Sequence, residues 1–257
     1  RRPLRLARSV QWLLTQELRL RRALRSADGV QANGYPAMAA YGGLNDDTCL
    51  YLDNRSERET MATASEMQAR AGWNGPLRIV HAGRLIAMKG TQDLIPTAIA
   101  LREQGVDFRM DIFGAGDMRQ AIADDVARHD LGEAVHLHQP VDFATGLVPW
   151  MRRNADLFLA PHRQSDPSCS YLEAMGCGVP VLGTNNRMWS ELAQQSGGGW
   201  VMPMGQPRKA ADIIAGLDRA AIAKASAHAL DFAQAHDFHS EFRRRMEHLH
   251  RVAAKPA

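Results

Sequence analysis

The sequence has few cysteines and no long apolar run, and these absences exclude several classes of protein. Three cysteines occur among 257 residues, none in a C-x-x-C pair, which indicates a reducing compartment rather than a disulfide framework. No stretch of about 18 consecutive apolar residues occurs, so we predict no membrane-spanning segment, and no signal peptide is visible. A net charge of +3 is too small to indicate nucleic-acid binding. We therefore expect a cytoplasmic protein.

The sequence also lacks complete motifs for a nicotinamide cofactor or a metal ion. Gly114 and Gly116 form a G-A-G element, but the third glycine of a dinucleotide fingerprint is missing. His136 and His138 are spaced to share one face of a strand, yet no third ligand is evident. We interpret them as packing or surface residues. No D-x-D motif follows a strand, so we expect neither a metal nor a bound cofactor.

From Leu77 onward, apolar strands alternate with helical segments, and apolar residues make up 45% of the chain, enough for a packed core. This alternation predicts an α/β fold with a doubly wound, Rossmann-like parallel sheet. The predicted strands are Leu77–Ala82, Phe108–Phe113, Val135–Gln139, Asp156–Ala160, Val179–Gly183 and Gly199–Met202. The predicted helices are Lys89–Gln104, Met118–His129, Thr145–Asn154, Ser168–Met175, Trp189–Gln195 and further helices from Pro207 onward. Polar or glycine-rich clusters follow the strands, where open α/β sheets bind ligands.

Residues 1–75 form the first of two predicted domains, and residues 76–257 form the second. The first begins with a helix over Arg1–Ser26 that has apolar residues at helical spacing and one acid, Glu17. Its arginines are Arg1, Arg2, Arg5, Arg8, Arg19, Arg21, Arg22 and Arg25. Such a helix suits peripheral contact with an anionic membrane at the inner face, and the alternative is a solvated basic face. Predicted next are strands Ala27–Ala32 and Thr48–Leu52, a helix Tyr35–Tyr41, a turn Asp53–Arg55 and a helix-prone connector Ser56–Gly72.

The stretch Ser165–Pro180 carries the strongest indication of a binding site. A turn precedes a short helix that begins near Ser168, where small polar residues leave the first backbone N–H groups free for an anion such as phosphate. Glu173 lies within the same helix and could accept hydrogen bonds from a diol such as a ribose. The alternative is an ordinary capped helix whose glutamate is a solvated surface charge.

This stretch, S-D-P-S-C-S-Y-L-E-A-M-G-C-G-V-P-V, resembles the donor-binding motif of family-4 retaining glycosyltransferases, which have the two-domain B-type fold. In that family an acidic residue precedes a second one by eight positions, and the second runs into E-A-M-x-C-G-x-P-V. Glu173 matches the second acid. The first acid falls on Ser165, with Asp166 one place later, so the sequence departs from the family pattern at the position that would contact the sugar.

A second motif, G-R-L-x-x-x-K-G, resembles the phosphate-binding loop of the same family. It contains Gly83, Arg84 and Lys89, and two cations on one loop suit a diphosphate, although two surface cations are a common event. The resemblance implies that Arg84 and Lys89 hold the donor's phosphates. It also implies that the loop with Gly114 and Gly116 lines the nucleotide site. The segment ending at Val141 would meet the nucleobase.

The resemblance covers about Leu77–Val252, and residues 1–75 resemble only the last part of an acceptor-side domain. It therefore implies the donor-binding half of a retaining glycosyltransferase, with Arg84, Lys89 and Glu173 as catalytic residues. The implied donor-binding residues are Gly83, Gly114, Gly116, Val141, Ser165, Asp166, Ser168, Cys169, Ser170 and Glu173. The expected partners are a nucleotide-sugar donor and a sugar, lipid-linked or other small acceptor, with no nucleic acid. The alternatives are a non-catalytic nucleotide-sugar-binding module and another enzyme of the same fold, such as a sugar-nucleotide epimerase.

Overall fold

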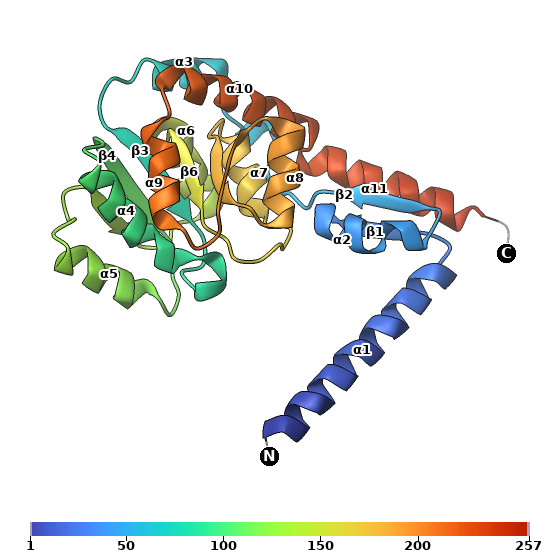
Figure 1. Ribbon diagram of the computed structural model, residues 1–257. Coiled ribbons are helices and arrows are strands. Elements are labelled where there is room, and N and C mark those ends of the chain that lie inside the picture. Colours follow the sequence, from blue (N-terminus) through green and yellow to red (C-terminus); the bar gives the residue numbers. More distant parts are fainter. Residues whose placement is uncertain (1, 256–257) are drawn as a thin grey trace.

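A computed structural model describes residues 2–255 of the chain and the side chains of residues 8–255. Its centre is a parallel sheet of six strands in the order β5-β4-β3-β6-β7-β8, which confirms the predicted α/β fold (Figure 1). The strands are β3 (Leu77–Ala82), β4 (Phe108–Phe113), β5 (Val135–His138), β6 (Leu157–Ala160), β7 (Val181–Thr184) and β8 (Gly199–Met202). Because the central strands β6 and β7 carry no charged side chain on either face, the sheet can be buried on both sides.

Helices cover both faces of this sheet, and each face has its own apolar core. One core is formed with α4 (Leu94–Glu103), α5 (Arg119–Arg128) and α9 (Pro207–Ala215). The other is formed with α6 (Val148–Asn154), α7 (Cys169–Gly176), α8 (Arg187–Ser196) and α10 (Arg219–Ala235). Side chains alternate along each strand, so Ile79 joins the first core and Val80 the second. This is the doubly wound arrangement that the alternating strands and helices predict.

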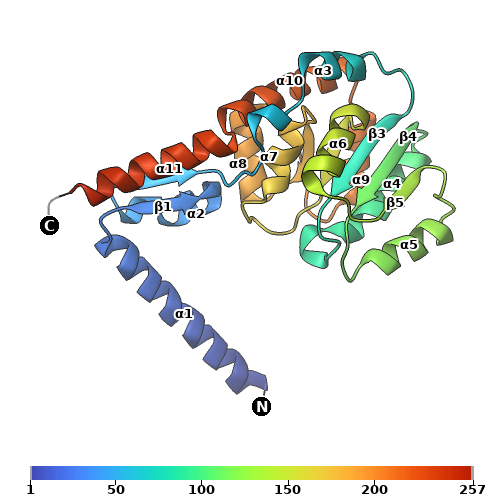
Figure 2. The same ribbon diagram turned by 180° about the vertical axis from the view of Figure 1, so that it is seen from behind.

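A smaller unit precedes the large sheet in the chain. It contains α1 (Arg2–Ser26), the parallel pair β1 (Val30–Asn33) and β2 (Thr48–Tyr51), and α2 (Gly34–Tyr41). The last helix, α11 (Phe238–Ala253), returns from the large sheet and lies along β1 and β2 in both views (Figures 1 and 2). There Arg245 Nε donates to Gln31 Oε1 at 3.2 Å. The resemblance implies a closing helix that packs across in this way.

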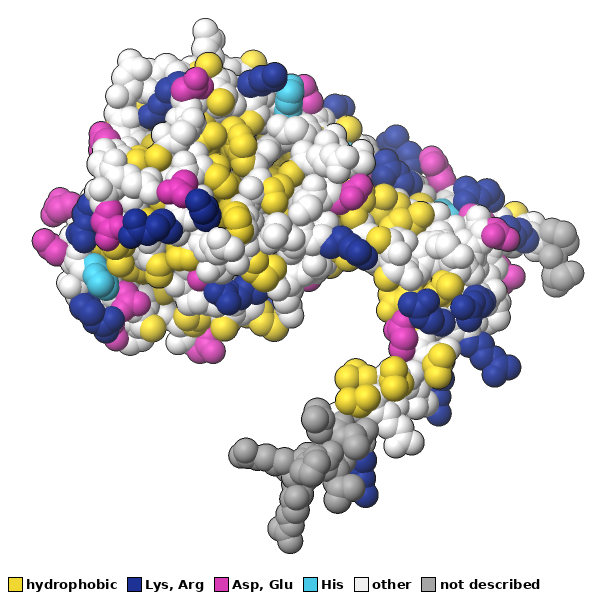
Figure 3. Space-filling model, viewed as in Figure 1, with side chains coloured by type: hydrophobic (Ala, Val, Ile, Leu, Met, Phe, Trp, Pro, Cys, Tyr) yellow, Lys and Arg dark blue, Asp and Glu magenta, His cyan; other side chains and the backbone are white. Residues whose placement is uncertain are grey.

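Helix α1 extends away from the rest of the chain, and apolar side chains gather along one side of it (Figures 1 and 3). Its exposed apolar residues are Val10, Trp12, Leu13, Leu14, Leu18 and Leu20. Near its end, Glu17 pairs with Arg21 at 2.7 Å and accepts a hydrogen bond from Tyr41. The side chains of Arg1, Arg2 and Arg5, predicted on the basic face, lie outside the described part. Within the described residues, no helix is both long and apolar enough to cross a membrane.

Two helix predictions are wrong in their boundaries, for identifiable reasons. A helix does not start at Lys89, because Gly90 adopts a left-handed conformation (φ 69°) and two 3₁₀ turns precede α4, which begins at Leu94. The connector Ser56–Gly72 is α-helical only over α3 (Ala64–Ala71), after a 3₁₀ turn at Arg58–Thr60. There Thr63 and Glu66 form a reciprocal capping box, which fixes the point where the helix begins.

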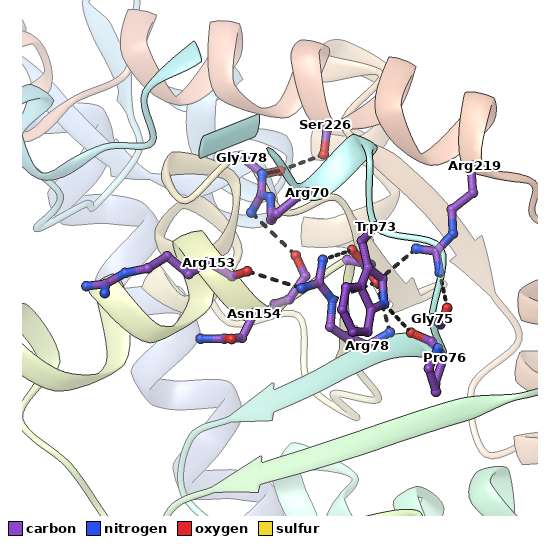
Figure 4. A network of polar contacts seen from close by, with 12 residues as sticks. Arg70, Trp73, Gly75, Pro76, Arg78, Arg153, Asn154, Gly178, Arg219 and Ser226 are labelled. Atoms are coloured by element: carbon purple, nitrogen blue, oxygen red, sulfur yellow. Dashed lines mark hydrogen bonds and ion pairs between the residues drawn. The ribbon is translucent and has the colours of Figure 1, made fainter. Parts of the chain in front are cut away.

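A network of arginines ties the helices together at the amino ends of the strands (Figure 4). Arg70, on α3, is buried and donates to the carbonyls of Cys177 (2.8 Å) and Gly178 (2.6 Å), just past the end of α7. Ser226 on α10 donates to the same Gly178 carbonyl at 2.6 Å. Asp156 pairs with Arg78 and with Arg219, so three segments meet at one buried carboxylate. The network lies at the edge of the sheet opposite to the predicted binding loops.

Candidate functional site

The predicted binding residues gather where the winding of the sheet reverses. Strands β4 and β5 lie on one side of β3, whereas β6, β7 and β8 lie on the other. The connections that leave the carboxyl ends of β3 and β6 therefore diverge and leave a crevice between them, which is where open α/β sheets bind ligands. The loop after β3 carries Gly83, Arg84 and Lys89, and the loop after β6 carries Ser165 to Ser168.

Lys89 joins these two loops at the amino end of α7. Its Nζ donates to Asp166 Oδ2 at 2.9 Å and to Ser168 Oγ at 3.2 Å. Ser168 is the N-cap residue of α7, and its hydroxyl is also 2.8 Å from that of Ser170 in the first turn. The lysine side chain is only 12% exposed. A cation, two hydroxyls and the amino end of a helix therefore face one point, and this combination suits an anionic ligand.

Glu173 lies one turn further along α7 and is buried, with a side chain 9% exposed. Its Oε1 accepts a hydrogen bond from Arg55 Nε at 2.5 Å. Burial raises the pKa of Glu173, while the positive charges of Arg55 and Lys89 act in the opposite direction. The guanidinium of Arg55 also stacks on the ring of Phe143, 3.7 Å from its centroid. The buried carboxylate of Glu173 therefore lies one turn from the amino end of α7, and Arg55 links it to the ring of Phe143.

Arg84 is exposed on the loop after β3, the same loop that carries Lys89. The loop that carries it is joined to the loop after β4, because Leu85 N donates to Ala115 O at 2.8 Å and Met118 N donates to Leu85 O at 3.0 Å. A Cβ atom at Gly114 would collide with the Gly83 carbonyl, and the same holds for Gly116 and Leu85. These glycines therefore allow two backbones to approach closely, which holds the Arg84 loop in place.

The other predicted donor-site residues have varied surroundings. Ser165 Oγ accepts from the backbone N–H of Arg187 at 3.1 Å, at the first residue of α8. Cys169 Sγ lies 3.8 Å from Asp53 Oδ2, and burial raises the pKa of this thiol to about 11, so it is protonated at neutral pH. Val141 is exposed in the loop after β5, two residues before Phe143.

A buried histidine follows β6, on the segment that leads to Ser165. His162, after β6, is 2% exposed, and its ring is 5.1 Å from that of Tyr171. Burial, together with the charge of Lys89, holds its pKa well below the usual range, so it is neutral. Its Nδ1 and the Oδ1 of Asp166 have no hydrogen-bond partner within the described residues. His162 is therefore a neutral side chain that packs against Tyr171, on the segment that leads from β6 to Asp166.

Arg55 and Asp53 reach the site from the connector before α3, and no pattern in the sequence indicates either of them. Arg55 is 118 positions from Glu173, and a turn of polar residues does not reveal a distant partner. Among the described residues, no group of three or more His, Cys, Asp and Glu side chains is arranged to hold a metal ion. The arrangement instead suits an organic ligand with anionic groups, bound by Lys89, Arg84 and α7, and hydroxyl groups, bound by Glu173.

Comparison with curated proteins identifies relatives whose names describe glycosyltransferases. The amylovoran biosynthesis glycosyltransferase AmsK of Erwinia amylovora is 28% identical over 164 residues, which cover 60% of this chain and 39% of AmsK. A D-inositol 3-phosphate glycosyltransferase of Arthrobacter sp. is 32% identical over 122 residues, which cover 43% of this chain and 27% of the relative. The matched part of the chain thus spans less than half the length of these relatives.

Solved structures share the fold at low sequence identity. The chain matches Anabaena HepE in complex with UDP with a TM-score of 0.72 and 21% identity, over 89% of this chain and 65% of HepE. It matches a sucrose-phosphate synthase from Thermosynechococcus elongatus with a TM-score of 0.73 and 20% identity, over 94% of this chain and 62% of the synthase. The sheet and its helices are therefore those of glycosyltransferases with the B-type fold.

The family assignment rests on the large sheet and its binding loops. Residues 76–218 match the family described as Glycosyl transferases group 1, and this segment is more than half of the chain. It contains all six strands of the large sheet and both loops that meet at Lys89. The chain therefore belongs to the group 1 glycosyltransferase family.

Proposed function

We propose that this chain is the nucleotide-sugar-binding part of a retaining glycosyltransferase of family 4. The observation that supports the proposal best is the meeting of Lys89, Ser168 and the amino end of α7 at the switch point of the sheet, with Glu173 one turn away. The site offers positive charge for a diphosphate and a carboxylate for ribose hydroxyls. The sugar forms of UDP and GDP contain both of these groups.

Each residue has a defined task in this proposal. Lys89, Arg84 and the first N–H groups of α7 bind the diphosphate, and Glu173 accepts hydrogen bonds from the ribose. In the transfer step, the bond between the anomeric carbon and the phosphate oxygen breaks through an oxocarbenium-like state. The new bond forms between the anomeric carbon and an acceptor oxygen, and the proton of the acceptor hydroxyl passes to the oxygen of the leaving diphosphate. The cations and the helix stabilise the negative charge that develops on the leaving diphosphate, so no step requires a metal ion.

Calorimetric titration with UDP and GDP tests the proposal, with Arg84→Ala as the diagnostic variant. Arg84 is exposed, so the variant should fold normally while binding of the matching nucleotide weakens about 10- to 100-fold, the worth of a charge-assisted hydrogen bond. Arg128→Ala, which removes an exposed arginine on α5, is the control and should bind like the wild type. Equal binding by both variants, or no binding of either nucleotide to the wild type, would contradict the proposal.

Turnover distinguishes an enzyme from a non-catalytic binding module. Ser165 stands where the family pattern has its first acid, and its hydroxyl accepts a hydrogen bond from the Arg187 N–H at the start of α8. An enzyme should release nucleoside diphosphate from its nucleotide sugar at a rate that a suitable acceptor increases. Saturable binding of the nucleotide sugar, with no release of nucleoside diphosphate in the presence of any acceptor tested, would favour the non-catalytic module.

Contact between α1 and an anionic membrane remains a prediction. The helix exposes apolar residues such as Trp12 and Leu14 together with several arginines, a composition that suits the surface of an anionic bilayer. Sedimentation with phosphatidylglycerol vesicles, compared with phosphatidylcholine vesicles, checks it. Trp12→Ser and Leu14→Ser together should abolish binding to the anionic vesicles, whereas equal sedimentation with both lipids would contradict the prediction.

A further inference from the structure

Arg55 lies on a connector whose backbone is fixed from both sides. Asn54 Nδ2 donates to the His236 carbonyl at 2.9 Å, and the Phe238 N–H donates to the Ser56 carbonyl at 3.0 Å. Just before these residues, the Leu52 N–H donates to Glu241 Oε2 at 2.9 Å. The segment that leaves β2 and the junction between α10 and α11 therefore run side by side, and they hold the Cα atom of Arg55 at a fixed place.

From this place the Arg55 side chain crosses to the large sheet and contacts two of its segments. It donates to Glu173 on α7 at 2.5 Å and stacks on Phe143, which follows β5, at 3.7 Å. The Arg55 side chain is 58% exposed, whereas that of Glu173 is 9% exposed. One edge of the guanidinium is thus bound to the buried carboxylate, and the remainder faces solvent beside the proposed nucleotide site.

Glu173 depends on a positive partner because burial raises its pKa and so disfavours its charged form. Its only cationic hydrogen-bond partner among the described residues is Arg55, since Lys89 is already bound to Asp166 at 2.9 Å. The other titratable groups nearby offer no positive charge. They are Asp53 and the thiols of Cys169 and Cys177. Burial raises the pKa of both thiols. Without Arg55, the pKa of Glu173 would therefore rise further, and the carboxylate would also be free to turn.

We propose that Arg55 is a positioning residue for ribose recognition: it fixes the Glu173 carboxylate so that its remaining acceptor sites meet the ribose hydroxyls. This inference rests on the proposed function, because it assumes a nucleotide at the switch point of the sheet. It adds that a residue outside the six-stranded sheet determines how well that sheet recognises ribose. Arg55 need not touch the nucleotide for this role. The same contact could instead block the site, and the two roles predict opposite effects when Arg55 is removed.

The experiment compares UDP and GDP with their 2′-deoxy forms by calorimetry, in the wild type and in Arg55→Ala, Arg55→Lys and Arg58→Ala. Arg58, an exposed arginine three positions further along the same connector, provides the control. In Arg55→Ala we expect the preference for the ribonucleotide over the deoxynucleotide to fall about tenfold, the worth of one charged hydrogen bond. Arg55→Lys should recover part of that preference, and Arg58→Ala should retain all of it.

The pH dependence separates positioning from a merely structural role. The preference for ribose requires ionised Glu173, so it should be lost as the pH falls, and in Arg55→Ala this loss should occur at a higher pH than in the wild type. An unchanged preference, or tighter nucleotide binding by Arg55→Ala, would overturn the inference while leaving the proposed function intact. If neither nucleotide binds the wild type, or if Arg84→Ala binds normally, the proposed function fails and this inference fails with it.

Discussion

Lys89 and Asp166 form an ion pair of 2.9 Å between Nζ and Oδ2, although they are 77 positions apart in the chain. The pair closes the space between the loops after β3 and β6, where the donor diphosphate is proposed to bind. A phosphate that approaches Lys89 therefore meets a lysine whose charge is already balanced. Since the carboxylate of Asp166 is more exposed (37%) than the ammonium of Lys89 (12%), Asp166 is the partner that can move aside.

The first prediction follows from this competition. Replacement of Asp166 by Asn removes the competing charge but keeps the side-chain shape, so UDP or GDP should bind about three- to tenfold more tightly, in the range of one partly exposed ion pair. Lys89→Ala should weaken the same binding at least as much. Calorimetry at low ionic strength measures both changes, and the gain in Asp166→Asn should shrink at about 0.5 M salt because exposed charges are then screened.

Asp107→Asn provides the control for Asp166→Asn. Asp107 directly precedes β4, at the amino ends of the strands and away from the proposed site, and it is exposed. Its replacement changes the net charge equally but should leave nucleotide binding unchanged. Equal tightening in both variants would show a general charge effect, and weaker binding in Asp166→Asn would show that this carboxylate itself binds the donor.

The second prediction concerns Gly90, which follows Lys89 in a left-handed conformation with φ 69°. A Cβ atom here would collide with the Pro161 carbonyl, so Gly90→Ala should combine backbone strain with a steric clash between the two loops. We expect a loss of about 2–4 kcal/mol in the free energy of unfolding, measured by urea titration. Gly105→Ala is the matched control.

Gly105 has almost the same conformation, φ 70°, but no heavy atom lies within 4 Å of the position that a Cβ atom would take there. Gly105→Ala should therefore cost about 1 kcal/mol, the contribution of backbone strain alone. Equal losses in the two variants would mean that the contact between Gly90 and Pro161 adds nothing. Because this contact also positions Lys89, Gly90→Ala should weaken nucleotide binding, whereas Gly105→Ala should not.

The sequence predicts local features of this protein well, because apolar runs and strand ends are local patterns. All six strands of the large sheet lie within two residues of their predicted bounds, since each is a largely apolar run. The sequence also shows that Arg84 and Lys89 follow one strand while Ser168 and Glu173 follow another. The parallel sheet then places both sets at one edge, as Lys89 and Ser168 show by their contact at 3.2 Å.

Contacts between distant segments are not predictable from one sequence. The turn at Asp53–Arg55 has no pattern that points to Glu173, so the sequence does not reveal the only direct cationic partner of that carboxylate within the described residues. The sequence predicts helices from Pro207 onward but not the boundary at Asp237, which accepts from the Ser240 N–H and starts a new helix. An aspartate that can cap a helix is visible in the sequence. The surrounding residues also favour an uninterrupted helix, so the sequence alone does not show whether the helix breaks at Asp237.

The third prediction is a loss of stability in mild acid. His81, at the end of β3, is fully buried; its Nδ1 lies 2.9 Å from the Leu159 carbonyl, and burial lowers its pKa to about 4. In the unfolded chain His81 takes up a proton near pH 6.5, the ordinary value for histidine, whereas in the folded chain it does so only near pH 4. As the pH falls from 6.5 towards 4, proton uptake therefore favours the unfolded state. Between about pH 7.5 and 5.0, His81 alone should cost about 2 kcal/mol of stability.

The variant His81→Leu isolates this contribution from those of other titrating groups. Its stability should fall by about 2 kcal/mol less than that of the wild type over the same pH interval, even if it is less stable throughout. The measurement is urea unfolding at both pH values. His250→Gln changes an exposed histidine on α11 and should reproduce the wild-type difference. A His81→Leu variant with the full pH dependence would show that His81 does not remain neutral in the folded protein.

The last prediction separates the arginine network from the binding site. Arg70 donates to the Cys177 and Gly178 carbonyls, and Ser226 donates to the second of these as well. Arg70→Met keeps much of the side-chain volume but leaves the buried Cys177 carbonyl without its partner. We expect a loss of about 2–3 kcal/mol in the free energy of unfolding, the cost of a buried polar group left unpaired.

Nucleotide affinity should nevertheless stay unchanged in Arg70→Met, because the network lies at the amino ends of the strands and the proposed site lies at their carboxyl ends. Arg153→Met removes an exposed arginine from α6 and should alter neither quantity by much. Urea unfolding and calorimetry on the same samples make the comparison. Weaker nucleotide binding in Arg70→Met, measured where the variant is fully folded, would mean that the position of α7 transmits the loss at its carboxyl end to Ser168 at its amino end. The network would then belong to the machinery that positions the donor, rather than to the stability of the fold alone.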